Sequence, residues 1–189
     1  MSKHIFLIVG KSGVGKTSIV SALCRKCGLK SVYSYTTRPK RNDDEKGHIF
    51  VSDADFDKIK YDLCAYTEFN GYRYGATNRQ INNCDLYVID YDGVKYFKEH
   101  YTGSKQPLVI LITANERTCK NRMLKRGDSE EAAEARVVND RVAFAQIDKI
   151  ADVAFENYSF TDCVNAIGTF IKHVNAGDYF KDNNAEEEN

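Results

Sequence analysis

The sequence predicts an α/β fold, with a mostly parallel sheet flanked by helices, from two observations. First, three continuous apolar runs, at residues 4–10, 86–90 and 107–113, have the length of buried strands. Second, each run is followed by a stretch in which apolar and polar residues recur with helical spacing. Continuous apolar runs are typical of parallel strands covered on both faces. Strands that alternate with helices in this way indicate an α/β domain.

Helices are expected where apolar residues recur every three or four positions. Ile19, Val20 and Leu23 form such a stripe directly after the first apolar run. Farther along, Ser52 and Asp55 have the spacing of a capping box, which predicts that a helix starts near residue 53. The helix with this stripe is expected to cover residues 16–27. Further helices are expected at residues 116–126, 130–150 and 161–174.

The middle of the chain carries strand and turn signals instead. Asn70-Gly71 lies between two short aromatic-rich runs, which is a strong hairpin signal. Residues 151–157 are expected to form the last strand of the main sheet. We therefore expect one domain at 1–176, with a core at 1–30 and 84–176, a small β-rich insertion at about 31–83 and a lid at about 126–142.

Charge is unevenly distributed along a chain with no net charge. Residues 1–42 carry nine lysines and arginines and no acidic residue, whereas residues 178–189 hold five acids and one lysine. A basic segment in a neutral chain favours a local anion site over a nucleic-acid surface. Residues 177–189 contain few apolar residues, so we expect a disordered acidic tail.

The composition also limits the location and the metal chemistry. No apolar run approaches the roughly 20 residues that span a membrane, so we expect a cytoplasmic protein without a membrane partner. Cys24 and Cys27 form a single C-x-x-C pair, and two ligands do not complete a tetrahedral zinc site. Reduced thiols are therefore expected.

The strongest functional signal is the segment GKSGVGKT at residues 10–17, which matches G-x-x-x-x-G-K-T. It lies between a predicted strand and a predicted helix, the context that a phosphate-binding loop requires. Backbone N–H groups of such a loop surround phosphate oxygens at the positive end of the helix. Lys16 is expected to reach the β and γ phosphates of a nucleoside triphosphate, and Thr17 to hold Mg²⁺. The residues expected to contact the nucleotide are Gly10, Lys11, Ser12, Gly13, Val14, Gly15, Lys16, Thr17 and Ser18.

Three further motifs follow this loop in a specific order. They are SYTTRPKR at residues 34–41, GHIFVS at 47–52 and NGYRYG at 70–75, and VID follows at 88–90. With them the chain resembles the guanylate kinase family from about residue 4 to 174. The resemblance implies a P-loop kinase in which the insertion binds the acceptor nucleotide. It also implies transfer of the γ-phosphoryl group of ATP to GMP or dGMP, with Mg²⁺ as cofactor, by a monomer or a homodimer.

The resemblance assigns roles on the acceptor side to individual residues. Arg38, Arg41 and Tyr74 match residues that hold the monophosphate of the acceptor, and guanidinium forks suit this task because they bind phosphate oxygens bidentately. Ser34 matches a position near the base. Asp90 matches an acid near the acceptor nucleotide and the magnesium ion, so Thr17 and Asp90 are the expected metal ligands.

Arg122, Arg126 and Arg136 match the lid and catalytic arginines of the family, and they complete the catalytic set with Lys16. Asn157 matches the turn beside the adenine of ATP. Independently of the resemblance, Arg122 and Arg126 are one helical turn apart, and phosphoryl transfer needs convergent positive charge. Arg141 has no clear match, and a site residue and a solvated helix face stay equally open for it.

The sequence departs from the family pattern around the base. Ala65 stands where the family usually has a glutamate that reads the guanine edge, and Ala76 stands where it has serine or threonine. Glu68 is three residues from Ala65, so on a strand it points to the opposite face. A phosphate-binding tyrosine of the family is missing, and His48 is expected to stand in for it. We therefore expect a preserved phosphate site and weaker discrimination among bases.

Two alternative functions stay open. A kinase that phosphorylates ribose 1,5-bisphosphate also resembles the chain at GHI, residues 47–49, and lacks the guanine-reading glutamate; retention of Arg41 favours a nucleotide acceptor. Guanylate kinase-like domains also serve as non-catalytic binding modules, which tend to lose the phosphate loop. This chain keeps that loop.

Overall fold

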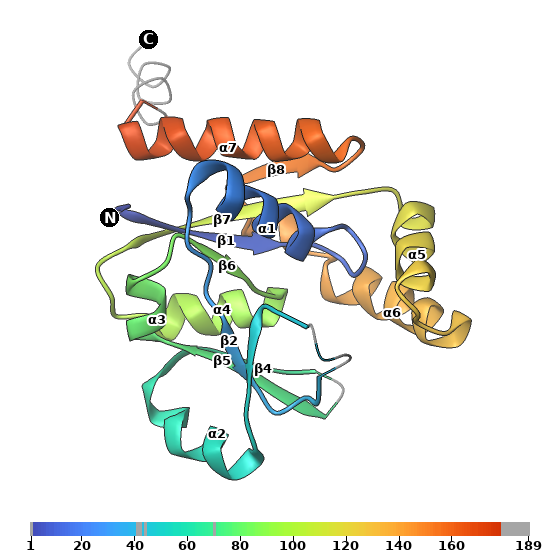
Figure 1. The fold of residues 1–189 in the computed structure, drawn as a ribbon, viewed down its shortest axis with the longest axis horizontal. Coiled ribbons are helices and arrows are strands. Elements are labelled where there is room, and N and C mark those ends of the chain that lie inside the picture. The colour runs from blue at the N-terminus through green and yellow to red at the C-terminus, as the bar shows by residue number, and fades with distance from the viewer. Residues whose placement is uncertain (1, 41–42, 44, 70, 179–189) are drawn as a thin grey trace.

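The computed structural model describes residues 2–40, 43, 45–69 and 71–178, and it contains two four-stranded sheets (Figure 1). The main sheet is entirely parallel, with the strand order β6-β1-β7-β8. Its strands are β1 (His4–Val9), β6 (Leu86–Val88), β7 (Gln106–Thr113) and β8 (Val153–Glu156). The predicted parallel α/β sheet is confirmed.

Helices cover both faces of the main sheet. The helices are α1 (Lys16–Cys27), α2 (Asp53–Ile59), α3 (Asn78–Asn82), α4 (Tyr91–His100), α5 (Glu116–Lys125), α6 (Glu130–Ala143) and α7 (Phe160–Ala176). Helices α1 and α7 lie on one face and α4 on the other (Figure 1). Strand β1 explains this arrangement, because Phe6 and Ile8 pack in the cluster with α1 and α7, whereas Ile5 and Leu7 pack in the cluster with α4. A strand buried on both faces has no alternation of apolar and polar residues.

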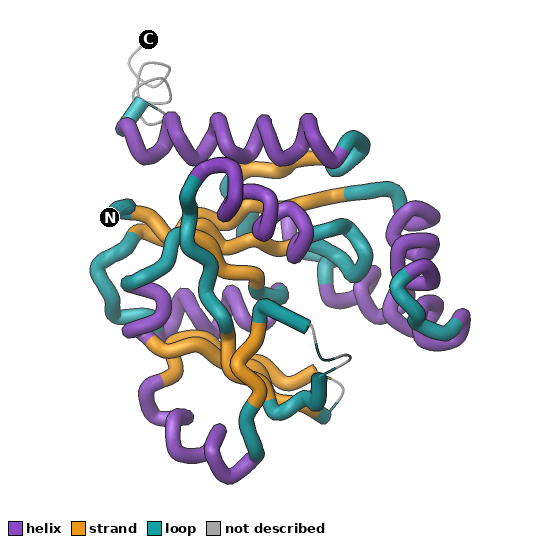
Figure 2. The backbone as a smooth tube through the Cα atoms, in the orientation of Figure 1, coloured by secondary structure: helices purple, strands orange, loops and turns teal. Residues whose placement is uncertain are grey.

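The second sheet comes from the insertion and lies beyond α4 (Figure 2). Its strands are β2 (Ser34–Thr36), β3 (His48–Phe50), β4 (Leu63–Phe69) and β5 (Tyr72–Thr77), in the order β3-β2-β5-β4. Strands β4 and β5 pair antiparallel, as the predicted hairpin requires. Asn70, at its turn, lies outside the described residues. Helix α4 packs on β4, so the two sheets share one apolar cluster.

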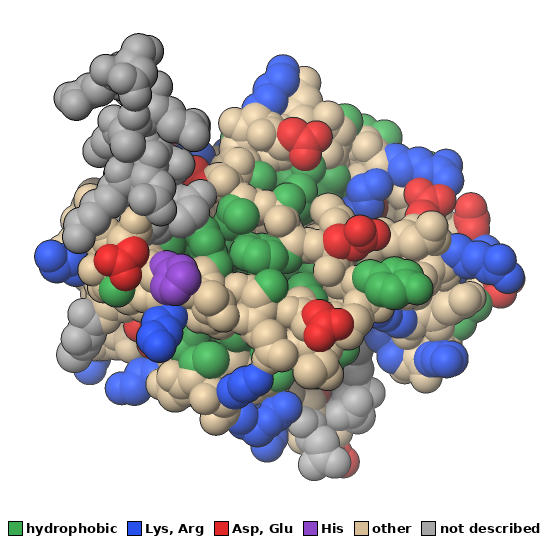
Figure 3. All heavy atoms as spheres, turned by 90° about the horizontal axis from the view of Figure 1, so that it is seen from above, with side chains coloured by type: hydrophobic (Ala, Val, Ile, Leu, Met, Phe, Trp, Pro, Cys, Tyr) green, Lys and Arg blue, Asp and Glu red, His purple; other side chains and the backbone are tan. Residues whose placement is uncertain are grey.

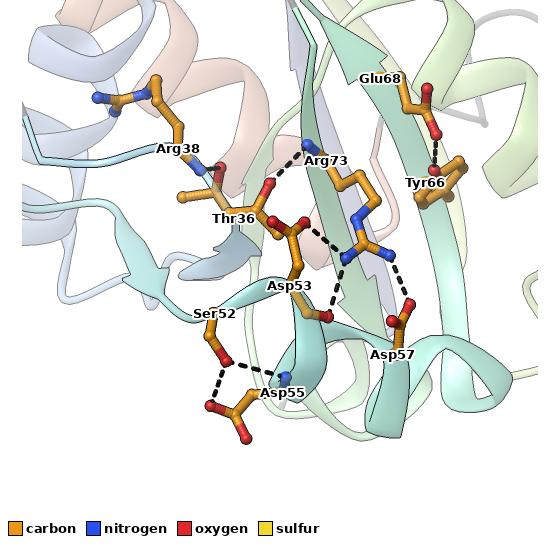
Figure 4. A network of polar contacts seen from close by, with 10 residues as sticks. Thr36, Arg38, Ser52, Asp53, Asp55, Asp57, Tyr66, Glu68 and Arg73 are labelled. Carbon is orange, nitrogen blue, oxygen red and sulfur yellow. Dashed lines mark hydrogen bonds and ion pairs between the residues drawn. The ribbon is translucent and has the colours of Figure 1, made fainter.

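A polar network attaches α2 to the second sheet (Figure 4). The guanidinium of Arg73, on β5, donates to Asp57 at 2.6 Å and to the carboxylate of Asp53 at 2.7 Å. The same guanidinium lies 4.8 Å from the ring centre of Phe56, a geometry that adds cation–π attraction. Helix α2 begins at Asp53, and the hydroxyl oxygen of the preceding residue, Ser52, accepts the N–H of Asp55 at 3.1 Å, so the predicted helix start is confirmed.

One predicted helix is too long. The pattern at residues 130–150 predicts a single helix, but α6 ends at Ala143 and a short 3₁₀ turn covers Ile147–Lys149. Phe144 and Ile147 are buried in the cluster around α4, so the chain turns inward to bury them. The short helix α3 was not predicted, although Thr77 and Gln80 form a capping box at its start.

Charged side chains of both signs cover the end of the molecule that carries α5 and α6 (Figure 3). Between these two helices, Lys120 contacts both Glu130 and Glu134, at 2.8 and 2.7 Å. Such exposed pairs add little to stability. Within the described part of the chain, no helix is both long enough and apolar enough to cross a membrane.

Candidate functional site

The loop between β1 and α1 has a backbone that requires glycine. Gly15 precedes α1 with φ of 102°, and Gly13 has φ of 77°, both in the left-handed region. A Cβ at Gly13 would lie 2.4 Å from the carbonyl oxygen of Cys119. The loop therefore packs directly on the start of α5, and its shape depends on that close approach.

Lys16 begins α1 and turns back over the loop. Its Nζ donates to the carbonyl oxygens of Gly10 at 2.5 Å and Lys11 at 3.1 Å. Burial lowers the pKa of Lys16 to about 8, against the attraction of Asp140 and Asp90. The ammonium group of Lys16 is therefore held against the loop carbonyl oxygens, where a further negative charge nearby would stabilise its cationic form.

The three predicted arginines come together at the same place. Arg122, on α5, donates to the carbonyl oxygen of Val14 at 3.0 Å. Arg126, directly after α5, pairs with Asp128 at 2.6 Å, and Arg136 on α6 lies 3.8 Å from the same carboxylate. We call the space that they enclose the loop cavity, which has a volume of about 560 Å³. Its lining residues are Ser12, Gly13, Gly15, Lys16, Thr17, Ser18, His48, Arg122, Arg126, Arg136, Asn157 and Phe160.

Asn157 follows β8 and is almost completely buried beside the loop. Its Nδ2 donates to the carbonyl oxygen of Val14 at 2.7 Å. Among the residues that the structure describes, its Oδ1 has no hydrogen-bond partner. Buried acceptors are rarely left unpaired, so this oxygen is an exception within the wall of the loop cavity.

A second cavity of about 260 Å³ lies on the side of the insertion, and we call it the fork cavity. Arg38 lines it, and its guanidinium holds the Glu45 carboxylate with two contacts, of 2.6 and 3.2 Å. Tyr74 also lines the fork cavity, whereas Arg41, the other predicted phosphate ligand, lies outside the described residues. Arg136 lines both cavities, so the two spaces share one side chain in their walls. The other lining residues are Pro39, Lys40, Phe69 and Tyr72.

His48 connects the insertion to the loop cavity. Its Nδ1 lies 2.9 Å from the hydroxyl oxygen of Ser34, and its ring meets that of Tyr74 edge-on, with centres 5.7 Å apart. Ser34 itself is buried. Ser34, His48 and Tyr74 therefore form one group of contacting side chains, and His48 also lines the loop cavity.

Asp90 is the N-cap of α4, where it accepts the N–H of Gly93 at 2.7 Å. Burial raises the pKa of this carboxyl group, while the hydrogen bonds from Gly93 and from the side chain of Thr67 oppose that rise. Asp90 therefore has a structural role besides any role in ligand binding. Thr17 lines the loop cavity with an exposed side chain.

The expected base-reading position is apolar. Ala65 on β4 lies opposite Ala76 on β5, and both are buried in the shared core. Glu68 contacts the hydroxyl of Tyr66 on the other face of the strand. Glu68 and Ala65 therefore point to opposite faces of β4, as their spacing predicts, and no carboxylate of β4 lies beside Ala65.

Carboxylates at the cavities were missed by the sequence reasoning. Glu45 pairs with Arg38, and Asp128 pairs with Arg126. Each acid is close in sequence to its arginine, so their spacing could have indicated these ion pairs. Asp140 accepts the N–H of Ser12 at 2.6 Å, and no local pattern indicates this contact.

Arg141 pairs with Glu116 at 2.5 Å, on an exposed surface. In the described structure this contact fits the solvated-face interpretation rather than a site role.

Comparisons with known proteins agree with this geometry. The family model described as guanylate kinase matches residues 2–174. A guanylate kinase of Thermobifida fusca is 30% identical over 171 residues, which cover 83% of this chain and 85% of that protein. One of Thermotoga maritima is 27% identical over 188 residues, covering 93% and 89%. The crystal structure of guanylate kinase from Anaplasma phagocytophilum has a TM-score of 0.67 at 16% identity, over 92% of this chain and 87% of that one, and at this identity the likeness concerns the fold.

Proposed function

This chain belongs to the guanylate kinase family, and we propose that it transfers the γ-phosphoryl group of ATP to GMP or dGMP. It is thus a phosphotransferase of the nucleoside monophosphate kinase class. One observation carries the proposal: Arg136 lines both the loop cavity and the fork cavity. A phosphoryl group passing between two nucleotides needs a cation that faces both of them.

The chain's own residues supply positioning and positive charge. The loop N–H groups and Lys16 hold the phosphates of ATP, and Arg122 and Arg126 add charge on the side of α5. Arg38 presents a fork for the acceptor phosphate, which takes the place that Glu45 occupies in this structure. Because the transition state of phosphoryl transfer is loose, this neutralisation and alignment account for most of the catalysis.

We propose Mg²⁺ as the cofactor, held by the hydroxyl of Thr17 and the carboxylate of Asp90. These oxygen donors fit the ion, since Mg²⁺ takes one or two protein oxygens together with waters and substrate phosphates. Across the described part of the chain, no group of three or more His, Cys, Asp or Glu side chains forms a metal site by itself. When bound, the ion neutralises charge on the phosphates.

We propose that this chain discriminates among nucleobases less strongly than family members that keep the guanine-reading glutamate. The phosphate contacts through Arg38 and Tyr74 do not depend on the base, while Ala65 and Ala76 offer guanine no polar group. A missing hydrogen bond to a charged group costs about 1.5–3 kcal/mol. GMP or dGMP is expected to stay the best acceptor, with AMP less strongly rejected. The cytoplasmic location and the choice between monomer and homodimer stay predictions.

The test is ATP-dependent release of ADP against GMP, dGMP, AMP, CMP, UMP, dTMP and ribose 1,5-bisphosphate. We expect the highest kcat/KM with GMP or dGMP, and Lys16→Ala should lower turnover by about 10²-fold or more, because a charge is removed from the transition state. Turnover of only ribose 1,5-bisphosphate would contradict the nucleotide acceptor. Equal turnover by Lys16→Ala would contradict the role of the loop.

A further inference from the structure

A carboxylate of the chain itself binds the phosphate-binding loop. The backbone N–H of Ser12, which lines the loop cavity, donates to Oδ2 of Asp140 at 2.6 Å. The two residues are 128 positions apart in the sequence. Backbone N–H groups of such a loop are the donors that hold phosphate oxygens. Asp140 therefore takes a hydrogen-bond position that suits an oxygen of a bound anion.

The surrounding charges favour this contact. Asp140 is the largest of the charges that stabilise the cationic form of Lys16, ahead of Asp90. Its carboxylate is thus attracted by Lys16, the same lysine that would attract the phosphates of a bound triphosphate. An incoming phosphate would meet both a loop N–H already in use and a like charge nearby.

The position of Asp140 depends on α6. Arg136 and Asp140 are four residues apart on this helix, so they share one face, and the helix offers a cation and an anion to the same region. The next residue, Arg141, joins α6 to the first turn of α5 through two contacts with Glu116, of 2.5 and 2.9 Å. This exposed pair lies where the end of α6 meets the start of α5.

We propose that Asp140 competes with the phosphates of ATP for the loop, so that ATP binds when α6 moves this carboxylate away. The inference rests on the proposed function, because it takes the loop to be the ATP site. Only molecules in which Asp140 has left the loop can then bind ATP, so the apparent affinity equals the intrinsic affinity multiplied by the fraction of such molecules. The exchange also couples donor binding to the helix that carries Arg136. Asp140 acts as a determinant of donor affinity and not as a catalytic residue.

The test measures ATP binding to the full chain by titration calorimetry, without acceptor, for Asp140→Asn and Asp140→Ala. Asparagine keeps a hydrogen-bond acceptor and loses the charge, whereas alanine loses both. We expect both variants to bind ATP about tenfold more tightly, which is about 1.4 kcal/mol. Glu134→Gln is the matched control, because it removes the same charge from α6 on the side that contacts Lys120. Its affinity for ATP should equal that of the wild type.

Three outcomes overturn the inference. Unchanged affinity in both Asp140 variants would mean that no competition exists. Weaker binding by Asp140→Ala, with Asp140→Asn near the wild type, would mean that the carboxylate orders the loop. Absence of ATP binding in the wild type and in every variant, with normal thermal unfolding, would overturn the proposed function as well. The first two outcomes leave that function intact, so the failures are distinguishable.

Discussion

The stability of this protein should depend on pH through Lys16. Burial lowers the pKa of this lysine from 10.5 to about 8, and the attraction of Asp140 and Asp90 only partly opposes the fall. In the unfolded chain the lysine has its ordinary pKa. Between about pH 8 and 10.5 the unfolded state therefore binds more protons than the folded state. The free energy of unfolding rises with pH in this window, and the contribution is lost as the pH falls through about 8.

The size of the effect follows from the same values. A pKa that falls from 10.5 to about 8 corresponds to about 3 kcal/mol over the whole window. Because Lys16 lines the loop cavity and keeps part of its surface exposed, we expect about 2 kcal/mol or less between roughly pH 7 and 9.5. Urea unfolding of the wild type and of Lys16→Met across this range measures it. The difference between the two proteins removes the titration of tyrosines, cysteines and other lysines.

A difference between wild type and Lys16→Met that does not change with pH would refute the reasoning. It would mean that solvent and the two carboxylates offset burial, so that Lys16 titrates near its ordinary pKa. The Asp140→Asn variant gives an internal check. It removes the largest stabilising charge on Lys16, so the rise in stability should begin at a lower pH than in the wild type.

Other predictions concern the loop, the shared arginine and the insertion. Gly13→Ala should lower the free energy of unfolding by about 2 kcal/mol, because its Cβ would meet the Cys119 carbonyl at 2.4 Å with φ of 77°; an unchanged urea midpoint would contradict this. Arg136→Lys keeps the positive charge but removes the guanidinium of the side chain that lines both cavities, so kcat should fall about 10²-fold in the ADP-release assay. A wild-type kcat in this variant would contradict a catalytic role of that guanidinium. Arg73→Met removes the hydrogen bonds and the cation–π contact to α2, so amide exchange there should become faster, with ATP affinity unchanged. Unchanged exchange would mean that the network adds nothing.

Local patterns alone determined much of the fold and of the loop. The apolar run at residues 4–10 predicts a strand buried on both faces, and the structure divides its side chains between two clusters. Ser52 marks the start of α2 because a helix terminus needs a local acceptor for its free N–H groups. The glycines of the segment at residues 10–17 were identified by spacing, since backbone shape is encoded residue by residue.

Tertiary structure decided what depends on competition between distant groups. Helix α6 ends at Ala143 because burial of Phe144 and Ile147 outweighs the local helical pattern. Which carboxylate meets which donor is likewise set by packing. Asp140 reaches Ser12 only because α6 packs beside α5 and the loop, and Arg136 borders both cavities for the same reason. Helical spacing specifies a face of α6, but the partner of that face is specified only when the whole chain has packed.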